Sequence, residues 1–140
     1  MRIDKNDLLL YAVTDRQWLG EASLAEQLEE AIQAGVTVVQ LREKELDFDA
    51  FVSLGKELQA VAKRHRIPFI INDAVDVALA LDADGVHVGQ SDMQAGDVRS
   101  RIGEEKILGV SAHSVEEALA AERNGADYLG VGAIYGTATK

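Results

Sequence analysis

The chain has 140 residues, of which 47% are apolar and 27% charged, a balance that is ordinary for a folded globular domain. Its net charge of −10 argues against general binding to nucleic acid or to anionic membranes, because both require basic patches. The sequence contains no cysteine, which excludes disulfides and thiolate metal sites and fits a cytoplasmic location. No apolar run approaches the ~20 residues that span a bilayer. The charged start, residues 1–7, lacks the apolar core of a signal peptide.

Strand-like and helix-like segments alternate along the whole chain. Short apolar, β-prone runs predict strands at 8–14, 36–41, 69–72, 86–88, 107–111 and 128–131. Amphipathic segments between them predict helices at 24–34, from 48 to about 65, at 75–81, at 93–102 and from 115 to about 124. Ser23, Asp47 and Ser114 stand at the expected N-cap positions. Nearly continuous apolar strands that alternate with helices indicate a parallel sheet covered on both faces.

Two of these helices carry stripes that are expected to face the core. In the helix that starts at 48, the stripe consists of Phe48, Phe51, Val52, Leu54, Leu58 and Val61. In the helix that starts at 115, it consists of Val115, Ala118, Leu119 and Ala121.

Polar side chains stand at the ends of five consecutive predicted strands. In chain order they are Gln40, Arg42 and Lys44; Asn72 and Asp73; His87 with Gln90, Ser91 and Asp92; Ser111 and His113; and Thr137, Thr139 and Lys140. Arg42 and Lys44 offer the planar donors and the point charge that suit a phosphorylated ligand. The alternative is a strand that runs into a solvated charged turn. Asp73 and Asp92 also fit helix N-caps, and His87 in an apolar strand also fits a hydrogen-bonded core residue.

Two architectures fit the alternation of strands and helices. The length favours an open, doubly wound sheet, in which ligands bind at one switch point. The polar residues favour a (β/α)8 TIM barrel, because every strand end of a barrel surrounds one mouth. Strand starts recur every ~24 residues, so eight units would need roughly 190 residues. We therefore expect residues 1–140 to form a single, partial TIM-barrel domain with six strands and five helices.

Four segments resemble the thiamine-phosphate synthase (thiamine-phosphate pyrophosphorylase) family of (β/α)8 barrels. They are QLREK at 40–44, FIINDAVDVALALDADGVHVGQSD at 69–92, LGVSAH at 108–113 and GADYLGVGAIYGTATK at 125–140, in the order in which the family has them. The resemblance implies a transferase of thiamine biosynthesis, with small-molecule substrates and Mg²⁺ as cofactor. Such an enzyme couples hydroxymethylpyrimidine pyrophosphate with thiazole phosphate to give thiamine phosphate and pyrophosphate. This chemistry needs a clamp on the leaving group more than a protein nucleophile.

The resemblance also implies a role for each site residue. Arg42, Lys44, Asn72 and Lys140 would contact the pyrophosphate, Asp73 and Asp92 would ligate Mg²⁺, Gln40 and His87 would line the pyrimidine pocket, Ser111 would approach the reacting substrate, and Thr137 and Thr139 would lie near the thiazole phosphate. Among these, Arg42, Lys44, Ser111 and Lys140 would be the catalytic residues.

The sequence departs from the family in two respects. The family has two more βα units, and it commonly has a proline where Tyr135-Gly136 precedes Thr137. Three readings follow: a piece of a longer enzyme, a homo-oligomer that associates through open barrel edges, or a non-catalytic barrel that binds a pyrophosphate ligand. A thiazole tautomerase-like homologue is a further alternative.

Overall fold

The computed structural model of the chain describes residues 3–90 and 95–138. Its strands are β1 (Tyr11–Val13), β2 (Val38–Leu41), β3 (Phe69–Asn72), β4 (Gly85–Val88), β5 (Ile107–Ala112) and β6 (Tyr128–Val131). Its helices are α1 (Leu24–Gln33), α2 (Phe48–Arg64), α3 (Val75–Leu81), α4 (Ala95–Ile102) and α5 (Val115–Arg123), with a short 3-10 helix, η1 (Arg16–Trp18). None of the described helices combines the length and apolarity needed to cross a bilayer.

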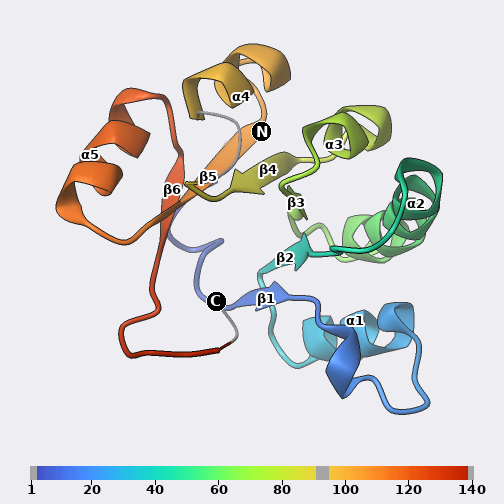
Figure 1. Cartoon of the computed structure of the whole chain (residues 1–140). Coiled ribbons are helices and arrows are strands. Elements are labelled where there is room, and N and C mark those ends of the chain that lie inside the picture. The colour runs from blue at the N-terminus through green and yellow to red at the C-terminus, as the bar shows by residue number, and fades with distance from the viewer. Residues whose placement is uncertain (1–2, 91–94, 139–140) are drawn as a thin grey trace.

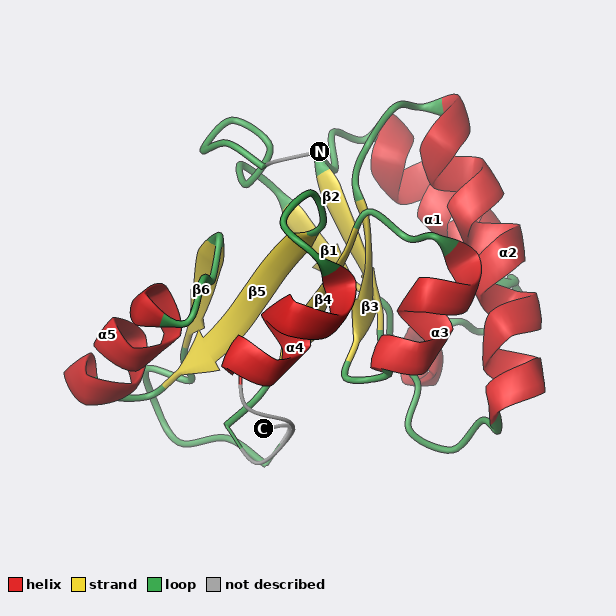
Figure 2. Cartoon of the chain, turned by 90° about the horizontal axis from the view of Figure 1, so that it is seen from above, coloured by secondary structure: helices red, strands yellow, loops and turns green. Residues whose placement is uncertain are grey.

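The six strands form one sheet in the order β1-β2-β3-β4-β5-β6, and every neighbouring pair is parallel. Figure 1 shows the helices on an arc outside the strands, from α1 round to α5. Figure 2 shows α1, α2 and α3 side by side along one part of the sheet, with α4 and α5 beyond them. The expected architecture, six strands and five helices of a TIM-type barrel, is confirmed.

The predicted elements are found in the predicted order, with small shifts at their ends. The strand at 69–72, the strand at 128–131 and the helix at 75–81 match the prediction. The first two strands are shorter than expected, and just before them the Leu10 N–H donates to the Thr37 Oγ1 at 2.9 Å instead of to a backbone carbonyl. The start of the helix predicted at 93 lies outside the described residues.

Local signals in the sequence account for three helix starts. The side chains of Ser23, Asp47 and Ser114 accept backbone N–H groups three residues on, at 3.1, 2.8 and 3.1 Å. Each bond satisfies one of the N–H groups that a helix start leaves without a partner. The three predicted N-caps are confirmed.

The sheet separates two apolar layers. The larger lies between the strands and the helices and is built on outward residues such as Val39, Ile71 and Leu108. The smaller lies on the inner face, where Val38, Ile70 and Ile107 are fully buried and partly buried residues of the N-terminal segment and of β6 pack against them. The register aligns the inner residues of neighbouring strands, so the inner face is apolar near the start of the strands and polar toward their ends.

The helix stripes are confirmed only in part: the α2 stripe packs in the core except at Phe48, and two of the four residues of the α5 stripe are exposed. Val115 and Leu119 of α5 are 71% and 48% exposed, and Phe48 of α2 is 50% exposed. In α5 only Ala121 is fully buried, because no described element covers the rest of its apolar side. Periodicity defines an apolar side of a helix, but only the neighbouring elements decide how much of it is buried.

The described sheet has two open edges. β1 pairs only with β2, and β6 pairs only with β5. On the outer face of β6, Leu129 and Val131 are 38% and 68% exposed. The loop after β6 lies on the side of the molecule between α5 and α1, where no described helix covers the strands (Figure 1).

Candidate active site

Four of the predicted site residues lie together on the inner face of the curved sheet. The register pairs Asn72 with His87, His87 with Gly109 and Ser111 with Gly130, and alternate residues of a strand share a face. Gln40 has the same orientation on β2, since its partner on β3 is the inward residue Ile70. All six strands are parallel, so their carboxyl ends form one rim, and these side chains approach it from inside.

The inner face also holds two tyrosines that the sequence analysis did not single out. Gln40 Nε2 donates to the Tyr11 hydroxyl at 2.8 Å, and that hydroxyl lies 2.5 Å from the Tyr128 hydroxyl. The Tyr128 hydroxyl lies 3.0 Å from His87 Nδ1, and His87 Nε2 lies 2.9 Å from Ser111 Oγ. We call these five side chains the polar chain. The polar chain connects five strands across the interior. The alternation of side chains along each strand could have revealed it from the sequence, because Tyr11 and Tyr128 fall on the same inward-facing side as Gln40 and His87.

Burial keeps both phenols neutral. Burial raises the pKa of Tyr11 above its ordinary value, although its hydrogen bonds with Tyr128 and Gln40 oppose this in part. The pKa of Tyr128 is raised strongly, first by burial and then by the neighbouring Tyr11. An ordinary phenol already titrates near pH 10, so both hydroxyls retain their protons at neutral pH and can donate.

The segment after β2 is held by contacts from the β1 side. The Arg42 backbone N–H donates to Thr14 Oγ1 at 3.0 Å. Glu43, whose side chain is only 7% exposed, accepts from Arg16 Nε at 2.8 Å. Arg42 is half-buried and Lys44 is exposed. The two candidate phosphate-binding cations therefore flank a carboxylate that is already paired, which fixes the course of the backbone between them.

Asp73 lies directly beyond β3 in an unusual backbone conformation. Its φ of +60° is in the left-handed region, which costs a non-glycine residue of order 1 kcal/mol. Its carboxylate is exposed and accepts from Asn72 Nδ2 at 3.1 Å. It does not cap α3, whose N-cap is Ala74 with no side-chain hydrogen bond. The capping alternative is therefore wrong, and a strained residue at a strand end points to a functional role.

Several predicted site residues cannot be placed. Ser91, Asp92, Thr139 and Lys140 lie outside the described residues, and Thr137 is exposed in the loop after β6. Within residues 3–90 and 95–138, no group of three or more histidine, aspartate or glutamate side chains could hold a metal ion. Of the two predicted Mg²⁺ ligands, the structure therefore describes only Asp73.

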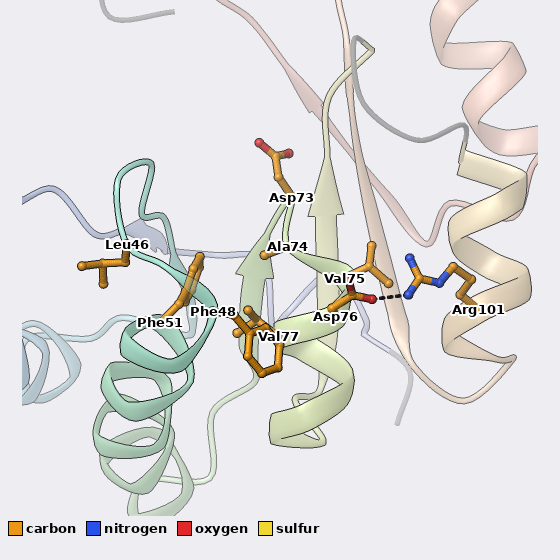
Figure 3. Close-up of a pocket in the computed structure, with 9 residues that line it drawn as sticks. All are labelled: Leu46, Phe48, Phe51, Asp73, Ala74, Val75, Asp76, Val77 and Arg101. Carbon is orange, nitrogen blue, oxygen red and sulfur yellow. Dashed lines mark hydrogen bonds and ion pairs between the residues drawn. The ribbon is translucent and has the colours of Figure 1, made fainter.

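A cavity of about 350 Å³ lies outside the strand rim, between the first turns of α2 and α3 (Figure 3). It is lined by Leu46, Phe48, Phe51, Asp73, Ala74, Val75, Asp76, Val77 and Arg101. An ion pair between Asp76 and Arg101 crosses its α4 side. In Figure 3 the Asp73 carboxylate points away from the phenylalanines. Asp73 is the only candidate site residue among those that line this cavity.

A curved parallel sheet with helices outside and polar side chains at one rim defines the barrel-type class of α/β proteins. The comparisons identify the family. The family model described as "Thiamine monophosphate synthase" matches residues 10–140. The chain belongs to this family.

Individual relatives agree with the family assignment. The chain is 58% identical over 134 residues to a thiamine-phosphate synthase of Clostridium acetobutylicum, and 49% identical over 134 residues to one of Caldanaerobacter subterraneus. These matches cover 96% of this chain but 64% and 63% of the relatives. A thiamine phosphate pyrophosphorylase structure from Pyrococcus furiosus aligns with a TM-score of 0.85 at 41% identity, over 93% of this chain and 62% of that one. The chain thus spans a little under two thirds of the length of these relatives.

Proposed function

We propose that this chain carries the pyrophosphate- and pyrimidine-binding part of a thiamine-phosphate synthase. The reaction couples hydroxymethylpyrimidine pyrophosphate with thiazole phosphate and releases pyrophosphate. The observation that carries the proposal is the convergence of Gln40, Asn72, His87 and Ser111 on the inner face, below the rim where Arg42 and Lys44 follow β2. Family membership supports the same reaction.

The roles of the residues follow from their chemistry and position. Arg42 and Lys44 would stabilise the negative charge that develops on the departing pyrophosphate, with Asn72 as a neutral donor beside them. Gln40 and His87 would line the pyrimidine pocket, and Ser111 would donate to the reacting substrate. Thr137 and Thr139 would lie near the thiazole phosphate, and Lys140 would add a further cation at the leaving group.

We propose Mg²⁺ as the cofactor. Asp73 fits, because an exposed carboxylate at a strand end is a hard oxygen donor, and Mg²⁺ is commonly held by one or two carboxylates and substrate phosphates. Asp92 would be the second ligand. When bound, the ion would neutralise charge on the pyrophosphate.

The open sheet favours one alternative from another class of function, a barrel that binds a pyrophosphate ligand without turnover. β1 and β6 lack a second strand partner among the described residues. A thiazole tautomerase-like role is less well supported, because such a protein would not need Arg42, Lys44 and Asp73 together.

The test is formation of thiamine phosphate from both substrates with Mg²⁺, with Lys44→Ala compared with Lys56→Ala. Lys56 is an exposed lysine of α2, so its removal controls for the loss of one positive charge. We expect Lys44→Ala to lower kcat by about a hundredfold or more, because it removes a cation aimed at the leaving group. The Lys56→Ala rate should match that of the parent chain.

Equal rates for the two variants would refute the assigned role of Lys44. If the parent chain gives no product, calorimetry with pyrophosphate and Mg²⁺ decides between the remaining readings. Mg²⁺-dependent binding that Lys44→Ala weakens supports the binding alternative. If pyrophosphate does not bind at all, the site itself is wrong.

Two further parts of the proposal concern the whole chain. We propose that copies of the chain associate through the open edges of the sheet, since unpaired edges and exposed apolar residues favour association. A cytoplasmic location stays a prediction, supported by the absence of cysteine from the sequence.

A further inference from the structure

The polar chain occupies space that two glycines leave free. A Cβ atom at Gly109 on β5 would meet the Tyr128 ring and would lie 2.6 Å from His87 Nδ1. A Cβ atom at Gly130 on β6 would lie 3.1 Å from the His87 ring. Both glycines are inward residues of the register. The interior is therefore shaped so that the Tyr128 and His87 rings can lie across it and bring their polar atoms together.

Counting protons gives the polar chain a direction. The Gln40 amide nitrogen donates to the Tyr11 hydroxyl, so the proton of Tyr11 is available for the Tyr128 hydroxyl. The proton of Tyr128 then goes to His87 Nδ1, which must be an acceptor without its own proton. Neutral imidazole carries a single N–H, so His87 carries its proton on Nε2 and donates it to Ser111 Oγ. In this arrangement the protons that Gln40, Tyr11, Tyr128 and His87 contribute to the polar chain each have one acceptor.

A doubly protonated His87 does not fit the same contacts. Its Nδ1–H would donate to the Tyr128 hydroxyl, and the proton of Tyr128 would have to go to Tyr11. Tyr11 would then accept from both Gln40 and Tyr128, and its own proton would lack a partner within the polar chain. A buried polar group without a partner costs about 1–3 kcal/mol. The hydrogen-bond geometry of the polar chain therefore favours the neutral form.

The last member of the polar chain is the one that faces the rim. Ser111 lies near the carboxyl end of β5 and is half-buried. Because its oxygen accepts from His87, its own proton can go to a ligand. Within residues 3–90 and 95–138, the structure gives the Ser111 hydroxyl no acceptor, and the Gln90 amide bonds only to the Ser111 backbone carbonyl. The Ser111 end of the polar chain therefore presents a hydrogen-bond donor.

We propose that Tyr11 and Tyr128 are positioning residues that fix His87 as the Nε2–H tautomer and thereby hold Ser111 as a donor toward an anionic group of the substrate. The functional part of this inference rests on the proposed transferase reaction, in which negative charge grows on the leaving group. A hydroxyl that is already oriented as a donor needs no reorganisation when that charge appears. A serine free to rotate would present a lone pair to the anion for part of the time.

The experiment reads the His87 tautomer directly from the ring nitrogens of the ¹⁵N-labelled, ligand-free chain. Two-bond ¹⁵N–¹H correlation spectra distinguish the two neutral tautomers and the doubly protonated ring. The sequence has three histidines, so a His87→Gln spectrum assigns the signal. In the parent chain we expect a single Nε2–H form. Tyr128→Phe removes the hydroxyl that bonds Nδ1, so the ring nitrogens should shift toward the average of the two tautomers.

Tyr11→Phe is the second variant, because it leaves the contact between Tyr128 and His87 intact and removes the direction imposed on Tyr128, together with the hydrogen bond from Gln40. It should shift the His87 nitrogens in the same sense, and it keeps the test decisive if Tyr128→Phe fails to fold. Tyr135→Phe is the matched control, since Tyr135 is 86% exposed, and its spectrum should equal that of the parent. An Nδ1–H or doubly protonated ring in the parent would overturn the inference, and so would an unchanged tautomer in a folded Tyr11→Phe or Tyr128→Phe chain.

Kinetics supply the functional half of the test where turnover is found. Tyr128→Phe should lower kcat by about tenfold or more while KM for both substrates stays within about twofold, because orientation of one donor matters most in the transition state. A parallel rise in KM with unchanged kcat would instead assign Tyr128 to ground-state binding and overturn the positioning role. The spectra need no turnover, so failure of the tautomer inference is distinguishable from failure of the proposed reaction.

Discussion

Asp84 and Asp127 occupy equivalent places, directly before β4 and β6. Each precedes a strand, and each accepts a backbone N–H near the start of the strand before it, Asp84 from Phe69 of β3 and Asp127 from Leu108 of β5, both at 2.8 Å. Asp127 also pairs with Arg99 at 2.7 Å, with both side chains nearly buried. The same guanidinium donates to three backbone carbonyls where α4, β5 and β6 meet. One aspartate thus serves a single strand, whereas the other also neutralises a buried cation.

This difference predicts unequal losses of stability. Asp127→Ala leaves the Arg99 guanidinium buried without its carboxylate and should cost about 3–5 kcal/mol. Asp84→Ala removes a hydrogen bond acceptor, and none of the ion pairs described for residues 3–90 and 95–138 includes Asp84, so about 1–3 kcal/mol is expected. Urea unfolding of both variants checks the comparison. Equal shifts in midpoint would show that the ion pair adds nothing to the shared backbone contact.

At the scale of elements, helix starts and strand centres follow the local sequence closely, but burial does not. Ser114 caps α5 as predicted, yet α5 buries little of its apolar side. α2 shows the opposite case, because α1 and α3 pack on either side of it and Leu58 is fully buried. Leu58 of α2 and Leu119 of α5 both belong to predicted apolar stripes, but they therefore differ in how much they contribute to the free energy of unfolding.

A matched pair of substitutions measures that difference. Leu58→Ala should cost about 2–5 kcal/mol, because it opens a cavity in a closed part of the core. Leu119→Ala should cost about 0.5 kcal/mol or less, since this side chain is 48% exposed. Thermal or urea unfolding gives both values. A loss at Leu119 as large as that at Leu58 would mean that another element covers α5 in solution.

The part of the chain that the structure describes forms a curved sheet, and its two edge strands, β1 and β6, do not pair with each other. Tyr11 on β1 and Tyr128 on β6 bridge the interior through their hydroxyls, with ring centroids 5.6 Å apart. Two side chains meeting end to end span more than one interstrand spacing of about 4.8 Å. The edges are therefore held at a fixed separation by side chains while their backbone groups and the outer face of β6 stay open.

The open side predicts association that depends on concentration. We expect the solution mass from sedimentation or light scattering to rise above 15.1 kDa as concentration increases, since exposed apolar residues at unpaired edges drive pairing. Val131→Lys, on the outer face of β6, should weaken this association. Leu79→Lys is the control, because Leu79 is similarly apolar and 44% exposed but lies on α3. A constant monomer mass, or equal effects of the two substitutions, would contradict the role of the edge.

The sequence by itself determined the order of elements, the helix caps and the four polar residues that converge from β2 to β5, because these depend on local preferences and on the alternation of side chains along a strand. The sequence also indicated the family, because four segments resemble it and follow one another in the family's order. The tertiary structure alone decided which apolar sides are buried and that Tyr11 joins Tyr128, 117 residues apart, into one polar chain. It also decided that Asp73 lies in a left-handed conformation rather than capping α3. Such features depend on the curvature of the sheet and on which elements become neighbours. Neither can be predicted from a short segment of sequence.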